Sequence, residues 1–234
     1  MKRIWAIMVI AVTVGTAAFG HETAAPKKSQ AFRMSVGGGG FVSGDFSTWN
    51  VDEDVPGDLN RYNATLLGVG PYGFVDFKYV ELNVGLAYGK LKNSNADSDL
   101  ATNPHFPAHT FSLHGSVYFK YPFAISDTFS LFPLTGIDYD LYMLSKKADG
   151  RDAKFPISTG TQEASAREAL SALSFKLGIG LDTYFTDHLF LRTELLYGIK
   201  LPNKMEQYLD DVRQDIDWML SHGGDFKIAV GYRF

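Results

Sequence analysis

The chain has 234 residues, a formal net charge of −4 and no cysteine, which excludes disulfide scaffolds and thiol or cysteine-ligated metal chemistry. Mild acidity gives no electrostatic footprint for nucleic acid. Only one apolar stretch approaches the roughly 20 residues of a membrane helix, so a polytopic helical membrane protein is excluded. With 45% hydrophobic residues, 23 glycines and 14% aromatic residues, the composition indicates an ordered protein dominated by something other than helix.

The N-terminal segment has the pattern of a secretory signal peptide. Lys2 and Arg3 precede an apolar run from Ile4 to Val14, and small residues follow as far as Gly20. The alternative, a single membrane anchor, needs a longer apolar run. We therefore expect export by a bacterium, with a cleaved signal peptide over 1–20, a flexible lead-in over 21–30 and a mature domain over 31–234.

From residue 31 onward the hydrophobic pattern has a period of two. In 79–91, for example, the apolar Leu82, Val84 and Leu86 alternate with the small or polar Asn83, Gly85 and Ala87. The same alternation recurs along the chain, and it predicts about eight strands, at 31–46, 64–78, 79–91, 110–123, 128–143, 173–185, 189–201 and 224–234.

The length and faces of these strands favour a membrane barrel. Strands of soluble sheets usually have about 5 or 6 residues, whereas a strand that crosses a bilayer needs about 9 to 11. One face is large and apolar with aromatic residues at the strand ends, and the other mixes charges with glycine, as a narrow lumen requires. A water-soluble barrel with the faces reversed is the alternative that periodicity alone leaves open.

The connections between these strands alternate between long and short. Long connections are expected at 47–63, 92–109, 144–171 and 202–224, and short ones near 76–78, 126–128 and 186–188. Asp127 and Asp187 follow Ser126 and Thr186, and an aspartate in this position supports a tight turn. The pattern predicts an all-β fold, an eight-stranded up-and-down antiparallel transmembrane β-barrel with long outer loops and short periplasmic turns.

The C-terminal segment, from Phe226 to Phe234, is an alternating strand that stops on an aromatic residue. It resembles the closing strand of bacterial outer-membrane β-barrel proteins, and the segment 31–234 resembles the small eight-stranded OmpW, OmpX and OmpA-transmembrane-domain families. The resemblance implies that Tyr232 and Phe234 form a signal for the barrel-assembly machinery. Chain length and loops look more like OmpW, which implies a narrow channel for small or hydrophobic molecules.

The polar face supplies the residues expected to line the lumen. The main candidates are Glu81, His114, Lys120, Asp138, Lys176, Arg192, Glu194 and Lys227, and the same face carries Arg33, Asp140, Asp182, Lys200 and Asp225. Both signs are present in near balance, so the groups can pair and plug the barrel; the alternative is a gated polar path. Large inward candidates for an apolar path are Phe74, Phe132, Leu134, Tyr142, Tyr184 and Leu196.

Catalysis is not expected. His114-Gly115-Ser116 places a histidine and a serine on one strand face, as in outer-membrane lipid A deacylases, but no carboxylate can be assigned beside them from the sequence. His105 and His109 share a loop without a suitably spaced carboxylate, so no metal is expected. Nucleotide-binding and G-x-S-x-G motifs are missing from the sequence, and no cofactor is expected.

The loops are the other candidate location for function. Apolar residues spaced by three or four predict an amphipathic helix over 203–221, and 162–173 is a weaker helical segment. Two functions remain: a narrow OmpW-like channel, or a surface-exposed structural or adhesive barrel with a plugged lumen. The expected partners are outer-membrane lipid, the barrel-assembly machinery, and a host surface ligand or small apolar solute, without nucleic acid.

Overall fold

The computed structural model describes residues 34–51, 61–93, 108–147, 149–156, 163–204, 207 and 216–234. The expected signal peptide and lead-in, together with Arg33 and His105, lie outside these residues. In the described part of the chain, no helix is both long enough and apolar enough to cross a membrane.

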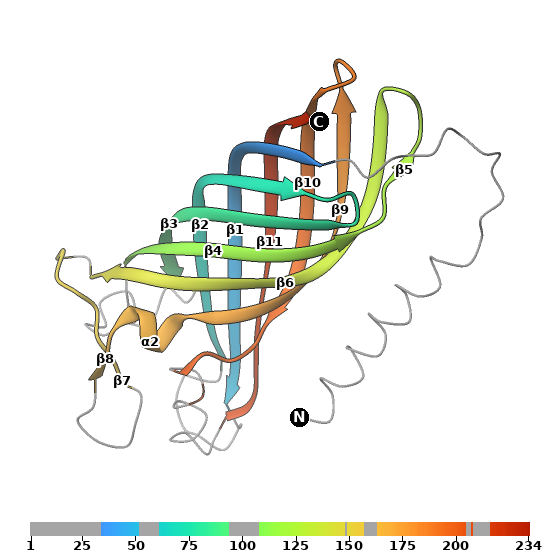
Figure 1. Cartoon of the computed structure of the whole chain (residues 1–234). Coiled ribbons are helices and arrows are strands. Elements are labelled where there is room, and N and C mark those ends of the chain that lie inside the picture. Colours follow the sequence, from blue (N-terminus) through green and yellow to red (C-terminus); the bar gives the residue numbers. More distant parts are fainter. Residues whose placement is uncertain are drawn as a thin grey trace. The chain divides into compact units, whose positions relative to one another are not determined.

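Within the described residues, eight long antiparallel strands form one closed sheet (Figure 1). Each long strand pairs with the next one along the chain, β4 pairs with β6, and β11 returns to β1 to close the barrel. The fold is therefore an up-and-down barrel, as the alternation predicts. The strands are β1 (Ser35–Val51), β2 (Arg61–Asp76), β3 (Val80–Asn93), β4 (His109–Lys120), β6 (Phe129–Lys146), β9 (Ala172–Tyr184), β10 (Leu189–Lys200) and β11 (Ile216–Arg233).

Four short elements supplement the barrel. β5 (Phe123–Ala124) pairs with β6, β7 (Phe155–Pro156) pairs with β8 (Glu163–Ala164), and α2 spans Ala166–Leu170. At the start of α2, the backbone N–H of Ser165 donates to Glu168 Oε2 at 3.1 Å, and the Ser165 hydroxyl donates to the same oxygen at 3.0 Å. These bonds lower the pKa of Glu168. The helix lies within the segment 162–173, which the sequence predicts to be weakly helical.

The expectation of a helix over 203–221 is wrong for its last part. Residues 216–221 belong to β11, where Leu220 pairs with Thr48 and Ser221 with Ser47 of β1. Barrel closure supplies a full ladder of backbone hydrogen bonds, and this tertiary pairing overrides the local helical period. Lys204 and Gln207 are helical, while 205–206 and 208–215 lie outside the described residues. Strands also extend into the other expected long connections, for example β6 as far as Lys146.

The short turns depend on hydroxyl groups. Ser126 Oγ accepts the backbone N–H groups of Thr128 and Phe129 at 3.2 and 3.1 Å. Thr186 Oγ1 does the same for His188 and Leu189 at 3.3 and 2.9 Å. The sequence predicts tight turns at both places, but the residue before each aspartate makes these turn-closing bonds. Both turns lie at the same end of the barrel as the C-terminus (Figure 1).

The outward face of the barrel is an apolar band with aromatic borders. On β3, Leu82, Val84 and Leu86 are exposed, while the residues between them are buried. Exposed aromatic residues border this band in the pairs Tyr79 and Tyr88, Phe129 and Tyr139, and Phe175 and Phe185. Their separation of about 9 to 10 positions is what a tilted strand needs to cross a hydrocarbon layer. The apolar side of the alternation thus faces outward, as a membrane barrel requires.

Candidate functional site

The structure turns the eight main lumen candidates toward the barrel interior. Glu81, Glu194 and Arg192 have at most 1% of their surface exposed, and Lys120, Asp138, Lys176 and Lys227 are also buried. The side chain of His114 is 16% exposed. Their function in that position remains a prediction.

Arg192, on β10, joins carboxylates from three other strands. Its Nε lies 2.7 Å from Asp182 on β9, its Nη1 lies 2.5 Å from Glu81 on β3, and its Nη2 lies 2.8 Å from Asp76 on β2. β10 does not pair with β2 or β3, so the bonds to Asp76 and Glu81 cross the interior, whereas Asp182 lies opposite Arg192 on the neighbouring β9. Lys120 on β4 adds bonds to Asp76 and Glu81 at 2.6 and 3.0 Å. This group, the Arg192 layer, lies nearest the short turns.

Aromatic rings cover the guanidinium of Arg192. The ring centres of Phe74, Phe132 and Phe190 lie 4.4, 5.1 and 5.2 Å from its Cζ atom, within cation–π range. Each ring occupies space that a glycine leaves open. A Cβ at Gly37 would clash with Phe74, one at Gly180 with Phe132, and one at Gly231 with Phe190. The high glycine and aromatic contents are therefore two parts of one packing arrangement.

The middle of the interior is organised by two lysines. Lys176 Nζ donates to Asp138 Oδ2 at 2.7 Å and to Asp225 Oδ2 at 2.5 Å. Lys227 Nζ lies 4.9 Å from the ring centre of Tyr118 and 5.5 Å from that of Tyr72. The neighbouring Glu194 is fully buried, and neither of its carboxylate oxygens has a hydrogen-bond partner in the described part of the chain.

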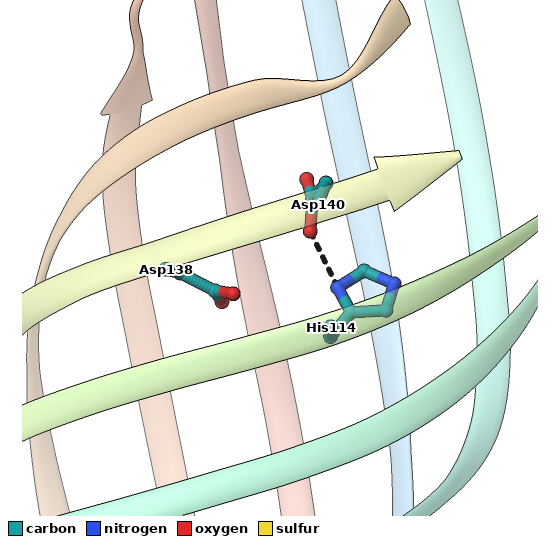
Figure 2. Close-up of side chains that lie close together, drawn as sticks. All are labelled: His114, Asp138 and Asp140. Atoms are coloured by element: carbon teal, nitrogen blue, oxygen red, sulfur yellow. Dashed lines mark ion pairs between the residues drawn. The ribbon is translucent and has the colours of Figure 1, made fainter. Parts of the chain in front are cut away.

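A third group lies nearer the long connections. Lys200 Nζ is 2.7 Å from both Asp45 and Asp140. His114 Nδ1 is 2.5 Å from Asp140 Oδ1, and His114 Nε2 is 3.0 Å from the Ser112 hydroxyl. Figure 2 shows the imidazole and the carboxylates of Asp138 and Asp140 on the two adjacent strands β4 and β6. These three side chains, the His114 cluster, each offer one ligand atom, and the atoms lie within 4.8 Å of one another.

A small pocket lies beside the His114 cluster. Its volume is about 10 Å³, roughly the room that one water molecule needs. Its lining includes Asn83, His114, Ser116, Asp138 and Lys227. Asp138 Oδ1 and Asn83 Oδ1 are buried and lack hydrogen-bond partners among the described residues. An unpaired buried oxygen is costly, so this pocket suits a water molecule or a small cation.

The structure supplies the carboxylate that the sequence cannot assign beside His114, because Asp140 pairs with it across β4 and β6. The hydroxyl that bonds the ring is that of Ser112, not Ser116. A serine, a histidine and a carboxylate in this order resemble a nucleophile, base and orienting acid. Ser112 is 4% exposed, and the pocket beside His114 has room for about one water molecule.

Several interior residues are not among the lumen candidates, and three of them bond to charged candidates. Asp45 pairs with Lys200, Asp76 pairs with Arg192 and Lys120, and Tyr118 donates to Asp138 Oδ2 at 3.3 Å. Both aspartates lie within the strands predicted at 31–46 and 64–78, and the period of two of those strands places both on the inward face.

Carboxylates outnumber basic side chains among the described interior residues. There are eight carboxylates and six lysine or arginine side chains, and Arg33, which the sequence also predicts to face inward, lies outside the described residues. The carboxylates belong to Asp45, Asp76, Glu81, Asp138, Asp140, Asp182, Glu194 and Asp225, and the cations to Lys120, Lys176, Arg192, Lys200, Lys227 and Arg233. A proton, His114 in its charged form or a bound cation would offset the difference.

Tyr232 and Phe234 lie on the outward face, at the short-turn end. Their side chains are 46% and 63% exposed. The Tyr232 ring stacks on His188 with centres 5.5 Å apart, and Phe234 packs edge-on against Tyr232 at 5.2 Å. The backbone N–H of Phe234 donates to Met34 at 3.0 Å, which joins the chain end to the start of β1.

Comparisons with known proteins agree with this architecture. The family model described as "Outer membrane protein beta-barrel domain" matches residues 6–234. A comparison with curated proteins gave no match.

Among solved structures, the chain is similar to the outer membrane protein OprG from Pseudomonas aeruginosa, with 12% identity, 87% of this chain and 96% of that chain covered, and a TM-score of 0.46. It is also similar to the attachment invasion locus protein Ail of Yersinia pestis, with 14% identity, coverage of 87% and 99%, and a TM-score of 0.34. The outer membrane protease OmpT from Escherichia coli has 8% identity, coverage of 91% and 100%, and a TM-score of 0.40.

Proposed function

The chain belongs to the family of outer-membrane protein beta-barrel domains, and we propose that it is a closed barrel that acts through its outer end rather than by conducting solutes. Its location is the bacterial outer membrane, in agreement with the apolar outward band and its aromatic borders. The proposed activity is non-catalytic, since the histidine cluster lies beside a pocket of about 10 Å³.

The observation that carries this proposal is the set of buried bonds that Arg192 makes, two of which cross the interior to β2 and β3. Its guanidinium reaches Asp76, Glu81 and Asp182 at 2.5 to 2.8 Å, and all four residues are buried. An eight-stranded barrel encloses little more than the volume of its own side chains. Removing one partner of a buried ion pair costs about 3–5 kcal/mol, and a solute that passed through the lumen would have to break several such ion pairs at once.

The outer end of the barrel supports a surface role. β6 continues from the aromatic border at Tyr139 to Lys146, toward the long connections. Lys146 there forms a largely exposed ion pair with Asp152 at 2.6 Å. Long outer connections on a rigid barrel are common locations for binding. We place a host surface ligand at this end, lipid around the apolar band and the barrel-assembly machinery at the C-terminal strand.

Planar-bilayer recording of the purified, refolded protein tests the proposal. The wild-type barrel should insert without discrete single-channel steps, and a shift in gel mobility on boiling provides the control for folding. A variant with the β6–β9 connection shortened to a tight turn should stay folded and closed, because no residue of the Arg192 layer is changed. It should lose the surface binding of the parent.

The narrow OmpW-like channel is the alternative that this recording would reveal. Phe132, Leu134 and Leu196 are large, apolar and buried, as an apolar path would require. Discrete conductance steps, or uptake of an apolar dye into the folded barrel, would contradict the closed interior and support the channel instead.

A further inference from the structure

The His114 cluster combines donor atoms of the kinds that bind a first-row divalent metal. His114 lies on β4 opposite Asp140, and Asp138 lies two residues from Asp140 on the same face of β6. One imidazole nitrogen and two carboxylate oxygens lie within 4.8 Å of one another. Metal–ligand bonds of about 2.0–2.2 Å set the donor atoms roughly 3.0–3.5 Å apart. Side-chain rotations would therefore have to widen the 2.5 Å contact between His114 and Asp140 and bring Asp138 closer. Figure 2 shows that the three side chains come from two adjacent strands.

In both Asp138 and Asp140, the Oδ2 atom already bonds to a lysine. Lys176 bonds Asp138 Oδ2 and Lys200 bonds Asp140 Oδ2, each at 2.7 Å. This leaves Oδ1 of Asp140 against the imidazole and Oδ1 of Asp138 without a hydrogen-bond partner in the described part of the chain. Carboxylates that bind metals are themselves usually hydrogen-bonded in this way, and the bonds orient the ligating oxygen.

The imidazole is oriented as well. The Ser112 hydroxyl lies 3.0 Å from His114 Nε2 and can accept a hydrogen bond from Nε2–H, which would leave Nδ1, the nitrogen next to Asp140, as the ligand. Histidines that bind metals generally donate their other ring N–H to a nearby acceptor. The hydrogen-bonding partners that a metal site needs around its ligands are therefore present for all three donors.

Two further observations favour a cation over an empty pocket. Asp138 is 3% exposed and lines the pocket of about 10 Å³, and its Oδ1 atom has no hydrogen-bond partner among the described residues. The pocket has room for a water ligand. Asn83 also lines this pocket, and its Oδ1 atom likewise has no hydrogen-bond partner in the described part of the chain. Among the described residues, the interior moreover has two more carboxylates than lysine or arginine side chains, and a divalent cation would offset that excess.

We propose that His114 Nδ1, Asp138 Oδ1 and Asp140 Oδ1 bind one divalent cation of the zinc or manganese class, with water as a further ligand. Imidazole favours zinc-like metals, carboxylates favour harder ions such as manganese, and the mixed set suits both. The cation would replace the direct contact between His114 and Asp140 and would link β4 to β6. This site is independent of the proposed surface role.

The test uses full-length mature barrel refolded without a histidine tag, in buffer that contains Zn²⁺ or Co²⁺ alone. Calorimetry should give one Zn²⁺ per barrel, and the Co²⁺ form should show visible absorption bands. His114→Gln and Asp138→Asn should weaken binding by roughly 100-fold or more, since each removes a ligand. Asp225→Asn is the matched control, because Asp225 also bonds Lys176 and lines the pocket but is outside the donor set.

Wild-type protein that binds no metal after refolding in its presence would overturn the proposal, as would equal binding by all variants. If a variant does not fold, as judged by gel mobility, X-ray absorption of the wild-type Zn²⁺ form still decides. A Zn²⁺ ion bound by one imidazole nitrogen and several oxygen atoms would support the site, whereas a Zn²⁺ ion without an imidazole ligand would contradict it. His109→Gln and His222→Gln should keep the binding, since both histidines lie on the outward face.

Discussion

Arg192 shows how one side chain can organise the interior of a small barrel. Its three carboxylate partners come from β2, β3 and β9, and its guanidinium is covered by three phenylalanine rings. Gly37, Gly180 and Gly231 provide the space for those rings. The Arg192 charge thus forms one unit with its carboxylate partners, its aromatic cover and the glycines behind that cover. Changes at Arg192 should therefore strongly destabilise the folded barrel.

Arg192→Met should lower the stability of the folded barrel by about 3–5 kcal/mol, because Asp76, Glu81 and Asp182 lose their shared partner while they remain buried. Urea titration of the protein in lipid vesicles measures this as a lower unfolding midpoint. Arg192→Lys should be less severe, since it keeps the charge but loses the geometry that serves several carboxylates. A midpoint for Arg192→Met equal to that of the wild type would show that these bonds do not stabilise the barrel.

At the level of elements, the strands illustrate what a period of two can and cannot predict. It correctly predicts eight long strands and the inward side of β3, β4, β6, β9, β10 and β11. It fails at 216–221, where apolar residues at helical spacing belong to β11 because β1 supplies pairing partners as far as Val51. Such pairing depends on the opposite strand, so it is invisible in a local window.

The terminal strand carries the prediction that belongs to this scale. Deleting Phe234 should reduce the fraction of chains that reach the outer membrane in folded form, if Tyr232 and Phe234 act as an assembly signal. The measurement is the proportion of heat-modifiable protein in the outer-membrane fraction of expressing cells. Phe185→Ala is the matched control, because Phe185 is also exposed at the short-turn end, at 61% against 63% for Phe234.

Equal loss of assembly in both of these variants would argue against a special role for the chain end. Normal assembly of the chain that lacks Phe234 would argue against it more directly. The contact between the Phe234 N–H and Met34 is made by backbone atoms, so a Phe234→Ala variant separates the loss of the ring from the loss of that bond.

For the whole molecule, the composition is explained by the closed barrel. Large apolar residues form the outward band, while glycines, aromatic rings and charges fill the interior. The alternation indicates which charged residues face inward, but it cannot indicate which of them meet. Arg192 and Asp76 are 116 positions apart, and their contact depends on barrel closure. The pairing of His114 with Asp140 depends on the β4–β6 register, which shifts between Phe111 and Ser112.

The closed interior is the central claim, and single-cysteine labelling tests it most directly because the chain contains no other cysteine. Ser116→Cys places a thiol beside the interior pocket, whereas Asp152→Cys places one at the exposed outer end. When a membrane-impermeant maleimide is applied to the folded barrel, the thiol at position 116 should react at least roughly 100-fold more slowly than the thiol at position 152, because labelling at 116 requires local opening of the barrel. Comparable rates at the two positions would contradict a closed lumen.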